Sequence, residues 1–158
     1  MNDRAQHPDE FATAFEPALA RLQIRIETAC GSEAEWPAKV SAGIRAALAF
    51  AAADPAAAQI LTNEAMAEGK AGFARYDRMI EHFAAALQPG RAERPEGEWL
   101  PEITEKTMVG GVAMLIAQRL NFDRHAELPA IAPEAIQFVL TPYLGAAEAK
   151  RVAYDGAG

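Results

Sequence analysis

Apolar residues recur at three- and four-residue intervals along most of the chain. Phe11, Phe15, Leu19, Leu22 and Ile26 follow one another at spacings of four, four, three and four. This is the repeat of one face of an amphipathic helix. Alanine is abundant and runs of β-branched residues are missing, which disfavours strands. The pattern predicts an all-α fold: a multi-helix bundle of about six main helices.

Helix starts and stops divide the chain into segments. Pro37 and the pair Asp54–Pro55 are start signals, because aspartate caps a helix and proline fits its first turn. Pro17 predicts a kink or break in the first helix. The Gly- and Pro-rich residues 90–101 predict a loop or mobile flap. We expect main helices over residues 8–29, 37–53, 54–69, 71–87, 101–122 and 133–144, with a short last helix over 146–154.

The domain organisation follows from these segments. Residues 1–10 are expected to form an N-terminal tail or the remnant of a linker. Residues 11–154 are expected to form one helical domain, since their number matches a single domain with its own core.

The predicted fifth helix is apolar on every side between Met108 and Ala117. Such a helix must be covered all round, so one face should meet the core and another a partner. Its two central glycines each cost about 1 kcal/mol relative to alanine, which favours close approach by a neighbouring helix. We therefore predict a dimer interface on this helix and the sixth: Val109, Gly110, Ala113, Leu115, Ile116, Ala117, Leu120, Ile136, Val139, Leu140 and Tyr143.

Composition narrows the class of protein. No uninterrupted apolar run has the ~18 residues of a membrane span, and no apolar segment follows a basic N-terminus as in a signal peptide. The single cysteine, Cys30, fits a reducing cytoplasm. A net charge of −7 opposes the phosphates of nucleic acid, so these residues alone should not bind DNA well.

Catalytic and metal-binding patterns are missing from the sequence. None of the three histidines follows a glutamate at the Glu-x-x-His spacing, and HExxH, CxxC and GxSxG do not occur. Cys30 lies at a predicted helix end, where the dipole should raise its thiol pKa. We predict no catalytic residue, no metal and no cofactor. An enzyme using Glu64 and His82 as acid and base remains an alternative.

Several strings, taken in order, carry a family resemblance. They are Trp36–Pro37, residues 40–48, Asp54–Ala58, Glu64–Ala65, Leu100–Glu105 with Val109–Val112, and Leu140–Gly145 with Glu148–Ala149. In order and spacing they resemble the C-terminal regulatory domain of TetR-family transcriptional regulators, which include many repressors. The resemblance extends from about Phe11 to Val152.

The resemblance implies a ligand-sensing homodimer. In that family an N-terminal helix-turn-helix reads DNA, while a helical C-terminal domain encloses a ligand and its last two long helices form a four-helix dimer interface. The first four helices here, with part of the fifth, would enclose the cavity, and ligand binding would shift the first helix. Ten residues before Phe11 cannot form a helix-turn-helix, so DNA contact is expected only through one that this chain does not contain.

Large apolar side chains on the predicted helices are the candidates for a ligand cavity, with Glu64, His82 and Thr107 as polar anchors. An apolar or amphipathic ligand is expected in such a pocket. Methionines adapt to varied apolar ligands but are equally consistent with a plain core. The candidates are Phe15, Leu19, Phe50, Glu64, Met66, Tyr76, Met79, His82, Phe83, Thr107, Met108 and Val112. A stand-alone helical interaction or ligand-binding module without a transcriptional role is the main alternative.

Overall fold

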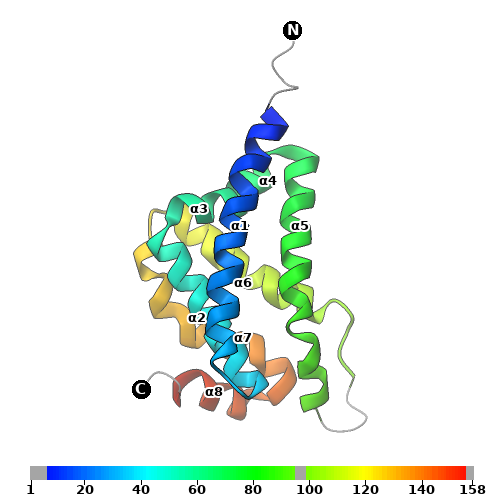
Figure 1. The fold of residues 1–158 in the computed structure, drawn as a ribbon. Helices are drawn as coiled ribbons and strands as arrows, with labels where there is room; N and C mark the ends of the chain where they lie inside the picture. Colours follow the sequence, from blue (N-terminus) through cyan, green and yellow to red (C-terminus); the bar gives the residue numbers. More distant parts are fainter. Residues whose placement is uncertain (1–6, 95–98, 156–158) are drawn as a thin grey trace.

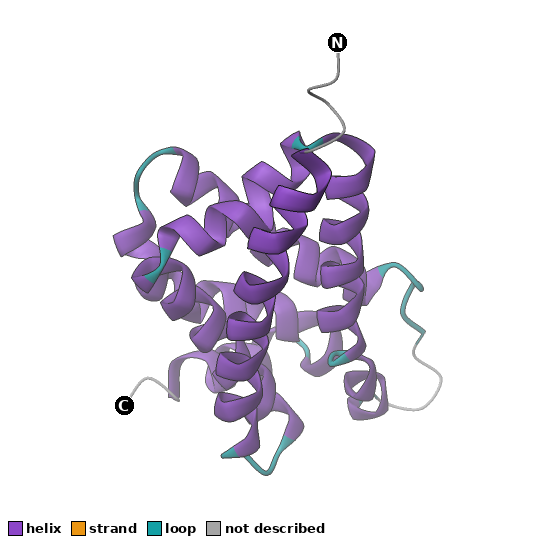
Figure 2. Ribbon diagram, turned by 45° about the horizontal axis from the view of Figure 1, so that its top comes forward, coloured by secondary structure: helices purple, strands orange, loops and turns teal. Residues whose placement is uncertain are grey.

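Helices account for all regular secondary structure in residues 7–94 and 99–155, the part of the chain that the computed structural model describes. The α-helices are α1 (His7–Gly31), α2 (Trp36–Ala53), α3 (Pro55–Gln59), α4 (Ala65–Ala67), α5 (Gly69–Ala85), α6 (Thr104–Asn121), α7 (Ala132–Leu144) and α8 (Ala146–Asp155). A π-helical turn, η1 (Ile60–Glu64), joins α3 to α4, and two 3-10 helices are η2 (Gln88–Glu93) and η3 (His125–Ile131). The predicted all-α bundle is confirmed (Figure 2).

Most predicted helix boundaries have local causes in the structure. The Asp54 carboxylate accepts the Ala57 backbone N–H at 3.1 Å, which caps the helical run that starts at Pro55. Gly69, the first residue of α5, and Gly145, which follows α7, both adopt φ of +81°, a conformation that glycine reaches without strain. Residues 1–6, most of the predicted tail, lie outside the described residues, whereas His7–Glu10 continue α1.

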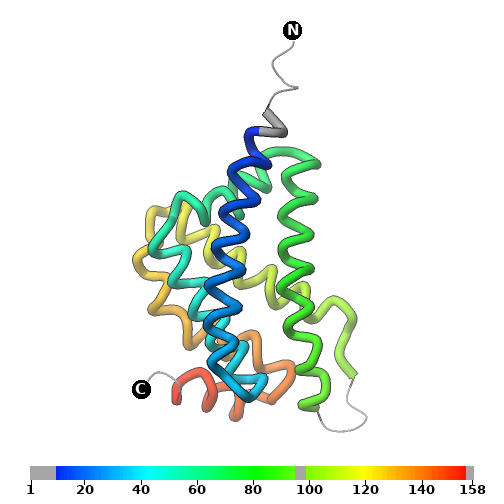
Figure 3. The backbone as a smooth tube through the Cα atoms, viewed as in Figure 1, coloured from blue at the N-terminus to red at the C-terminus, as the bar shows by residue number. Residues whose placement is uncertain are grey.

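Two local predictions are corrected in part. α1 does not break at Pro17 and runs to Gly31, as the smooth tube of Figure 3 shows. Phe15 and Ala18 on either side of that proline are each 1 % exposed, so their burial stabilises a helix that has lost one hydrogen bond. The predicted loop over residues 90–101 begins with the ordered turn η2, and residues 99–101 have no regular secondary structure, as predicted; residues 95–98 lie outside the described part.

Each long helix packs against several others. In Figure 1, α1 and α5 stand side by side at the front and α6 crosses behind them. α2 packs along α1, and α7 packs closely against α8.

In the described part of the chain, no single helix has the length and apolar character needed to cross a membrane. α2 and the Pro55–Ala67 segment meet that test only as a pair bent by 109°.

Two hydrophobic clusters form the core. The first, the α7 cluster, joins α2, α6, η3, α7 and α8 around Leu48, Ile136 and Leu140, each of which is 0 % exposed. The second, the α1 cluster, joins α1, the Pro55–Ala67 run and α5 around Phe15 and Ala65. α6 contributes to both clusters, because Val112 and Ile116 belong to the first and Ala113 to the second.

Most residues predicted for the dimer interface belong to this core instead. Their side chains are already buried within a single chain, so they present no surface to a second one; they are Ala113, Ile116, Ala117, Leu120, Ile136, Val139, Leu140 and Tyr143. Val109, Gly110 and Leu115 keep partial exposure. The all-round apolar character of α6 therefore arises from two core clusters on one side and a separate exposed face on the other.

The exposed face of α6 and α7 carries large apolar side chains. Met114 is 53 % exposed, Phe138 on α7 is 47 % exposed, and Phe122 at the end of α6 is 68 % exposed. Gly110 and Gly111 lie on the same face of α6, and the Phe138 ring packs beside Gly111. We call these five residues the α6–α7 face.

Candidate functional site

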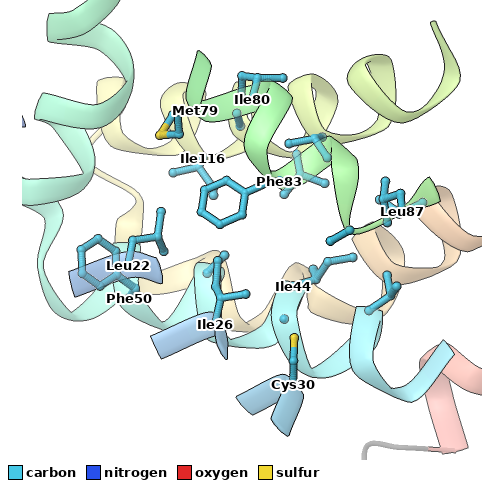
Figure 4. Close-up of a pocket in the computed structure, with 18 of the residues that line it drawn as sticks. Leu22, Ile26, Cys30, Ile44, Phe50, Met79, Ile80, Phe83, Leu87 and Ile116 are labelled. Carbon is cyan, nitrogen blue, oxygen red and sulfur yellow. The ribbon is translucent and has the colours of Figure 1, made fainter. Parts of the chain in front are cut away.

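A cavity of about 490 Å³ lies at the seam between the two core clusters. Val40, Val112 and Val139 come from the α7 cluster, whereas Phe50 and Leu61 come from the α1 cluster. Figure 4 shows side chains from several helices converging on the space, with Phe83 near its middle. This volume lies within the ~300–1,000 Å³ range of small-molecule sites.

The cavity has an exposed end and a buried end. Ala34, Lys39, Ala86 and Pro89 line it at one end and are exposed to solvent. At the other end the lining residues are buried, among them Phe50, Leu61, Ile80, Val112 and Val139. α2 borders the cavity from Trp36 to Ala51, a helical length of roughly 22 Å at 1.5 Å per residue. The space is therefore elongated and suits a long ligand.

The cavity wall is almost entirely apolar. Its polar side chains are engaged elsewhere: the Thr62 hydroxyl donates to Ala58 O at 2.7 Å, and the Cys30 thiol donates to Lys39 O at 3.3 Å. The Trp36 indole N–H donates to Ala86 O at 3.1 Å. Lys39 is the charged side chain in the wall, and it lies at the exposed end. A ligand in the buried part would be held by apolar contact.

Four of the predicted ligand residues line this cavity: Phe50, Met79, Phe83 and Val112. Phe15, Leu19 and His82 line a smaller pocket of about 150 Å³ between α1 and α5, and Met79 lines both. The remaining five predicted residues line neither space: Glu64, Met66, Tyr76, Thr107 and Met108.

These five residues lie on the surface or at the filled core clusters. Glu64 and Thr107 are exposed, and Thr107 lies on the outer side of α6, so neither serves as an anchor in the cavity. Tyr76 is 8 % exposed inside the α1 cluster. Met66 packs against that cluster and Met108 against the α7 cluster. For these two methionines the plain-core interpretation holds.

The sequence predicted that α1 borders the cavity, but it named Phe15 and Leu19 rather than the α1 residues that line it. Leu22, Ile26 and Cys30 line the cavity from this helix at four-residue spacing (Figure 4). Their periodicity marked a buried face but could not separate cavity wall from filled core. Gly43 on α2 lies opposite, since a Cβ there would be 3.2 Å from the Cys30 sulfur and 3.5 Å from Ile26.

An ion pair with a buried carboxylate holds the segment beside the exposed end of the cavity. The Glu105 side chain on α6 is 3 % exposed, and its carboxylate accepts two hydrogen bonds from Arg91 of η2 at 2.7 and 2.8 Å. Arg91 also donates to the carbonyls of Leu100 and Pro101. The hydrogen bonds from Arg91 lower the pKa of Glu105, whereas burial and the Glu105 charge raise the pKa of Tyr143.

The site offers little for covalent or metal chemistry. Burial is the main cause of the raised pKa of Cys30, partly offset by Lys39, so the thiol is a poor nucleophile at neutral pH. The described residues contain no group of three or more His, Cys, Asp or Glu side chains placed to hold a metal ion. The arrangement is suited to binding an apolar molecule.

Comparison of the chain with known protein families, with curated proteins and with solved structures found no match. The assignment of a function therefore depends on the cavity and its surroundings.

Proposed function

We propose that this chain is a small-molecule-sensing and homodimerising domain of the TetR regulatory type. The observation that carries the proposal is the elongated apolar cavity at the seam between two core clusters. A filled core is the ordinary outcome of folding, because interiors pack to crystal-like density with few voids larger than a water molecule. A cavity of this size therefore favours a ligand-binding role.

The place of α1 supports a sensing role. α1 borders the cavity through Leu22, Ile26 and Cys30 and packs along α2 for much of its length. In the regulators that the sequence resembles, the first helix of this domain transmits ligand binding to the DNA-reading part. A ligand that fills the cavity here would bear directly on α1. A sensor must bind its ligand more tightly in one conformation than in another. Because α1 borders the cavity, a shift of α1 would change the affinity for the ligand.

The α6–α7 face supports the dimer. Exposed apolar patches of this kind mark interaction sites more often than isolated surface residues do. The dimer would use Gly110, Met114 and Phe138 rather than the buried residues that the sequence indicated. If association were the chain's whole role, the cavity would stay empty, and binding experiments separate these two functions.

The first test is binding of Nile red, an uncharged apolar dye, by the purified chain. We expect saturable binding with a fluorescence increase, and bound small molecules in native mass spectra. The variant Ala47→Trp places an indole in the cavity wall, whereas Ala49→Trp places one at an exposed position on the same helix. We expect Ala47→Trp to weaken binding about fivefold or more, which corresponds to losing about 40 Å² of apolar contact.

Two results would contradict the proposal. Equal dye binding by the wild type and by Ala47→Trp would place the dye outside the cavity. No binding of dye, with no co-purified small molecule, would favour the association-only module. The Ala49→Trp control separates a blocked cavity from a general effect of the added indole.

A further inference from the structure

The small pocket between α1 and α5 gathers positive charge. Arg75, Arg78 and His82 lie on one face of α5 at spacings of three and four residues, and all three line this pocket of about 150 Å³. The chain as a whole carries a net charge of −7, so this concentration of basic groups is a local exception.

The pocket has fewer negative than positive groups. Glu16 is its acidic lining residue, and its carboxylate pairs with Arg75 at 2.7 Å. The Arg78 side chain makes no hydrogen bond or ion pair with any residue in the described ranges. The His82 imidazole contributes a further N–H donor. An anion entering the pocket would therefore meet at least one arginine with all its donors available.

The charged pocket adjoins the apolar cavity. The Met79 side chain, 5 % exposed, lines both spaces and forms their shared wall. The His82 ring packs edge-on against the Phe83 ring at 5.2 Å, and Phe83 lines the cavity. Methionine has three rotatable bonds and changes shape easily, so one molecule could extend past Met79 into both spaces.

We propose that the ligand of this cavity is an amphipathic anion, with its apolar chain in the cavity and a carboxylate or phosphate head group on Arg75, Arg78 and His82. The inference depends on the proposed ligand-binding function and specifies its ligand class. A volume of 150 Å³ holds a head group the size of a few water molecules, at about 30 Å³ each. Guanidinium groups bind planar carboxylates and phosphates through paired hydrogen bonds, which are stronger than those between neutral groups.

The test compares four probes that share one alkyl chain: laurate, dodecyl phosphate, dodecanol and dodecylammonium. Each displaces Nile red from the folded chain at low ionic strength, so each measured affinity refers to the cavity. We expect laurate or dodecyl phosphate to bind about tenfold more tightly than dodecanol, with dodecylammonium weakest. The order of laurate and dodecyl phosphate identifies whether the head group is a carboxylate or a phosphate.

The variant Arg78→Glu reverses the charge of an arginine in the pocket, and Arg25→Glu is its matched control. Arg25 is an exposed arginine on α1 that lines neither space, so its variant makes the same change in net charge. We expect Arg78→Glu to remove the preference for anions while dodecanol binds as before. Arg25→Glu should keep most of the preference.

Three outcomes overturn the inference while leaving the cavity function standing. They are equal affinities for laurate and dodecanol, a preference for dodecylammonium, or equal losses in Arg78→Glu and Arg25→Glu. Failure of Nile red to bind in the first place would instead reject the proposed function itself, so the two failures are distinguishable.

Discussion

Gly90 leaves the space that the aromatic ring of Trp36 occupies. The Trp36 indole lies directly over it, so a Cβ at position 90 would come within 2.2 Å of the ring. The same indole donates to Ala86 O and packs edge-on against Tyr143, with 5.2 Å between ring centroids. Trp36 therefore connects α2, η2 and α7 beside the exposed end of the cavity.

We expect Gly90→Ala to lower the free energy of unfolding by about 1–3 kcal/mol, the usual cost of overpacking. Urea denaturation followed by circular dichroism measures the loss. Gly31→Ala is the control, because a Cβ at position 31 meets nothing within 4 Å. Equal stability of the two variants would show that Trp36 is not held as described.

Glu105 is a second residue whose role depends on its partners. Replacing it with glutamine removes the charge from a buried carboxylate that accepts two hydrogen bonds from Arg91. We expect Glu105→Gln to destabilise the protein by about 1.5–3 kcal/mol, the range for hydrogen bonds to charged groups. Glu127→Gln, in an ion pair with both partners half-exposed, should change stability little. Equal losses of stability in Glu105→Gln and Glu127→Gln, measured by thermal unfolding, would contradict a stabilising role for the buried Glu105 carboxylate.

Acid should remove the contribution of Glu105. Arg91 lowers the pKa of this carboxyl below its ordinary value of 4.5 in the folded chain, so the unfolded chain binds more protons at moderately acidic pH. The stabilisation is therefore complete above about pH 4.5 and is lost as the pH falls through the lower folded-state pKa. We expect the stability difference between wild type and Glu105→Gln to narrow below pH 4.5 in urea titrations, and a constant difference would be inconsistent with the ion pair.

At the scale of elements, helix positions could be predicted because their signals are local. Asp54 with Pro55 starts a helix, and Gly145 ends one, through backbone geometry that neighbouring residues determine. Whether α1 would continue through Pro17 depended on burial of Phe15 and Ala18 against other helices. That contact is tertiary, so no local pattern could reveal it.

The π-helical turn η1 was also beyond sequence reasoning. Its extra residue rotates the chain so that Leu61 and Thr62 line the cavity while the Asn63 side chain donates to Ala117 O of α6 at 3.0 Å. Such turns occur inside α-helices and are frequent at functional sites. An uninterrupted helix, which the alanine-rich sequence predicts, would have placed these residues differently.

A side chain added at Gly110 tests whether this face of α6 is free of contacts within the single chain. A Cβ at this position meets nothing within 4 Å in the single chain. Gly110→Ala should therefore stabilise the monomeric fold by about 0.5–1 kcal/mol through helix propensity alone. Gly72→Ala should do the opposite, since its Cβ would lie 2.4 Å from Ala65 O. Chemical denaturation at a protein concentration low enough to keep the chain monomeric compares the two variants, and destabilisation by Gly110→Ala would show a hidden contact.

At the scale of the whole molecule, the cavity arises because two core clusters meet without filling the space between them. Periodicity identified the buried faces of α1, α2, α5 and α6, yet it carries no information about the distance between opposed faces. Phe50, Phe83, Tyr76 and Met108 were all recognisable as interior residues from the same pattern. Phe50 and Phe83 line the cavity, whereas Tyr76 and Met108 became filled core. The difference lies in how far apart the helices stand, which is a property of the complete fold.

The exposed α6–α7 face predicts how two copies would meet. If a partner helix packs across Gly110, a longer side chain there would separate the helices while leaving the single chain undisturbed. We expect Gly110→Gln to keep or increase the monomer's stability and to weaken self-association at least tenfold in sedimentation equilibrium, because close packing at glycine is lost. Ala49→Gln, at an exposed position on α2, should leave association unchanged. A wild-type chain that stays monomeric at high concentration would remove the dimer from the proposed function, whereas a dimer that tolerates Gly110→Gln would place the interface on another surface.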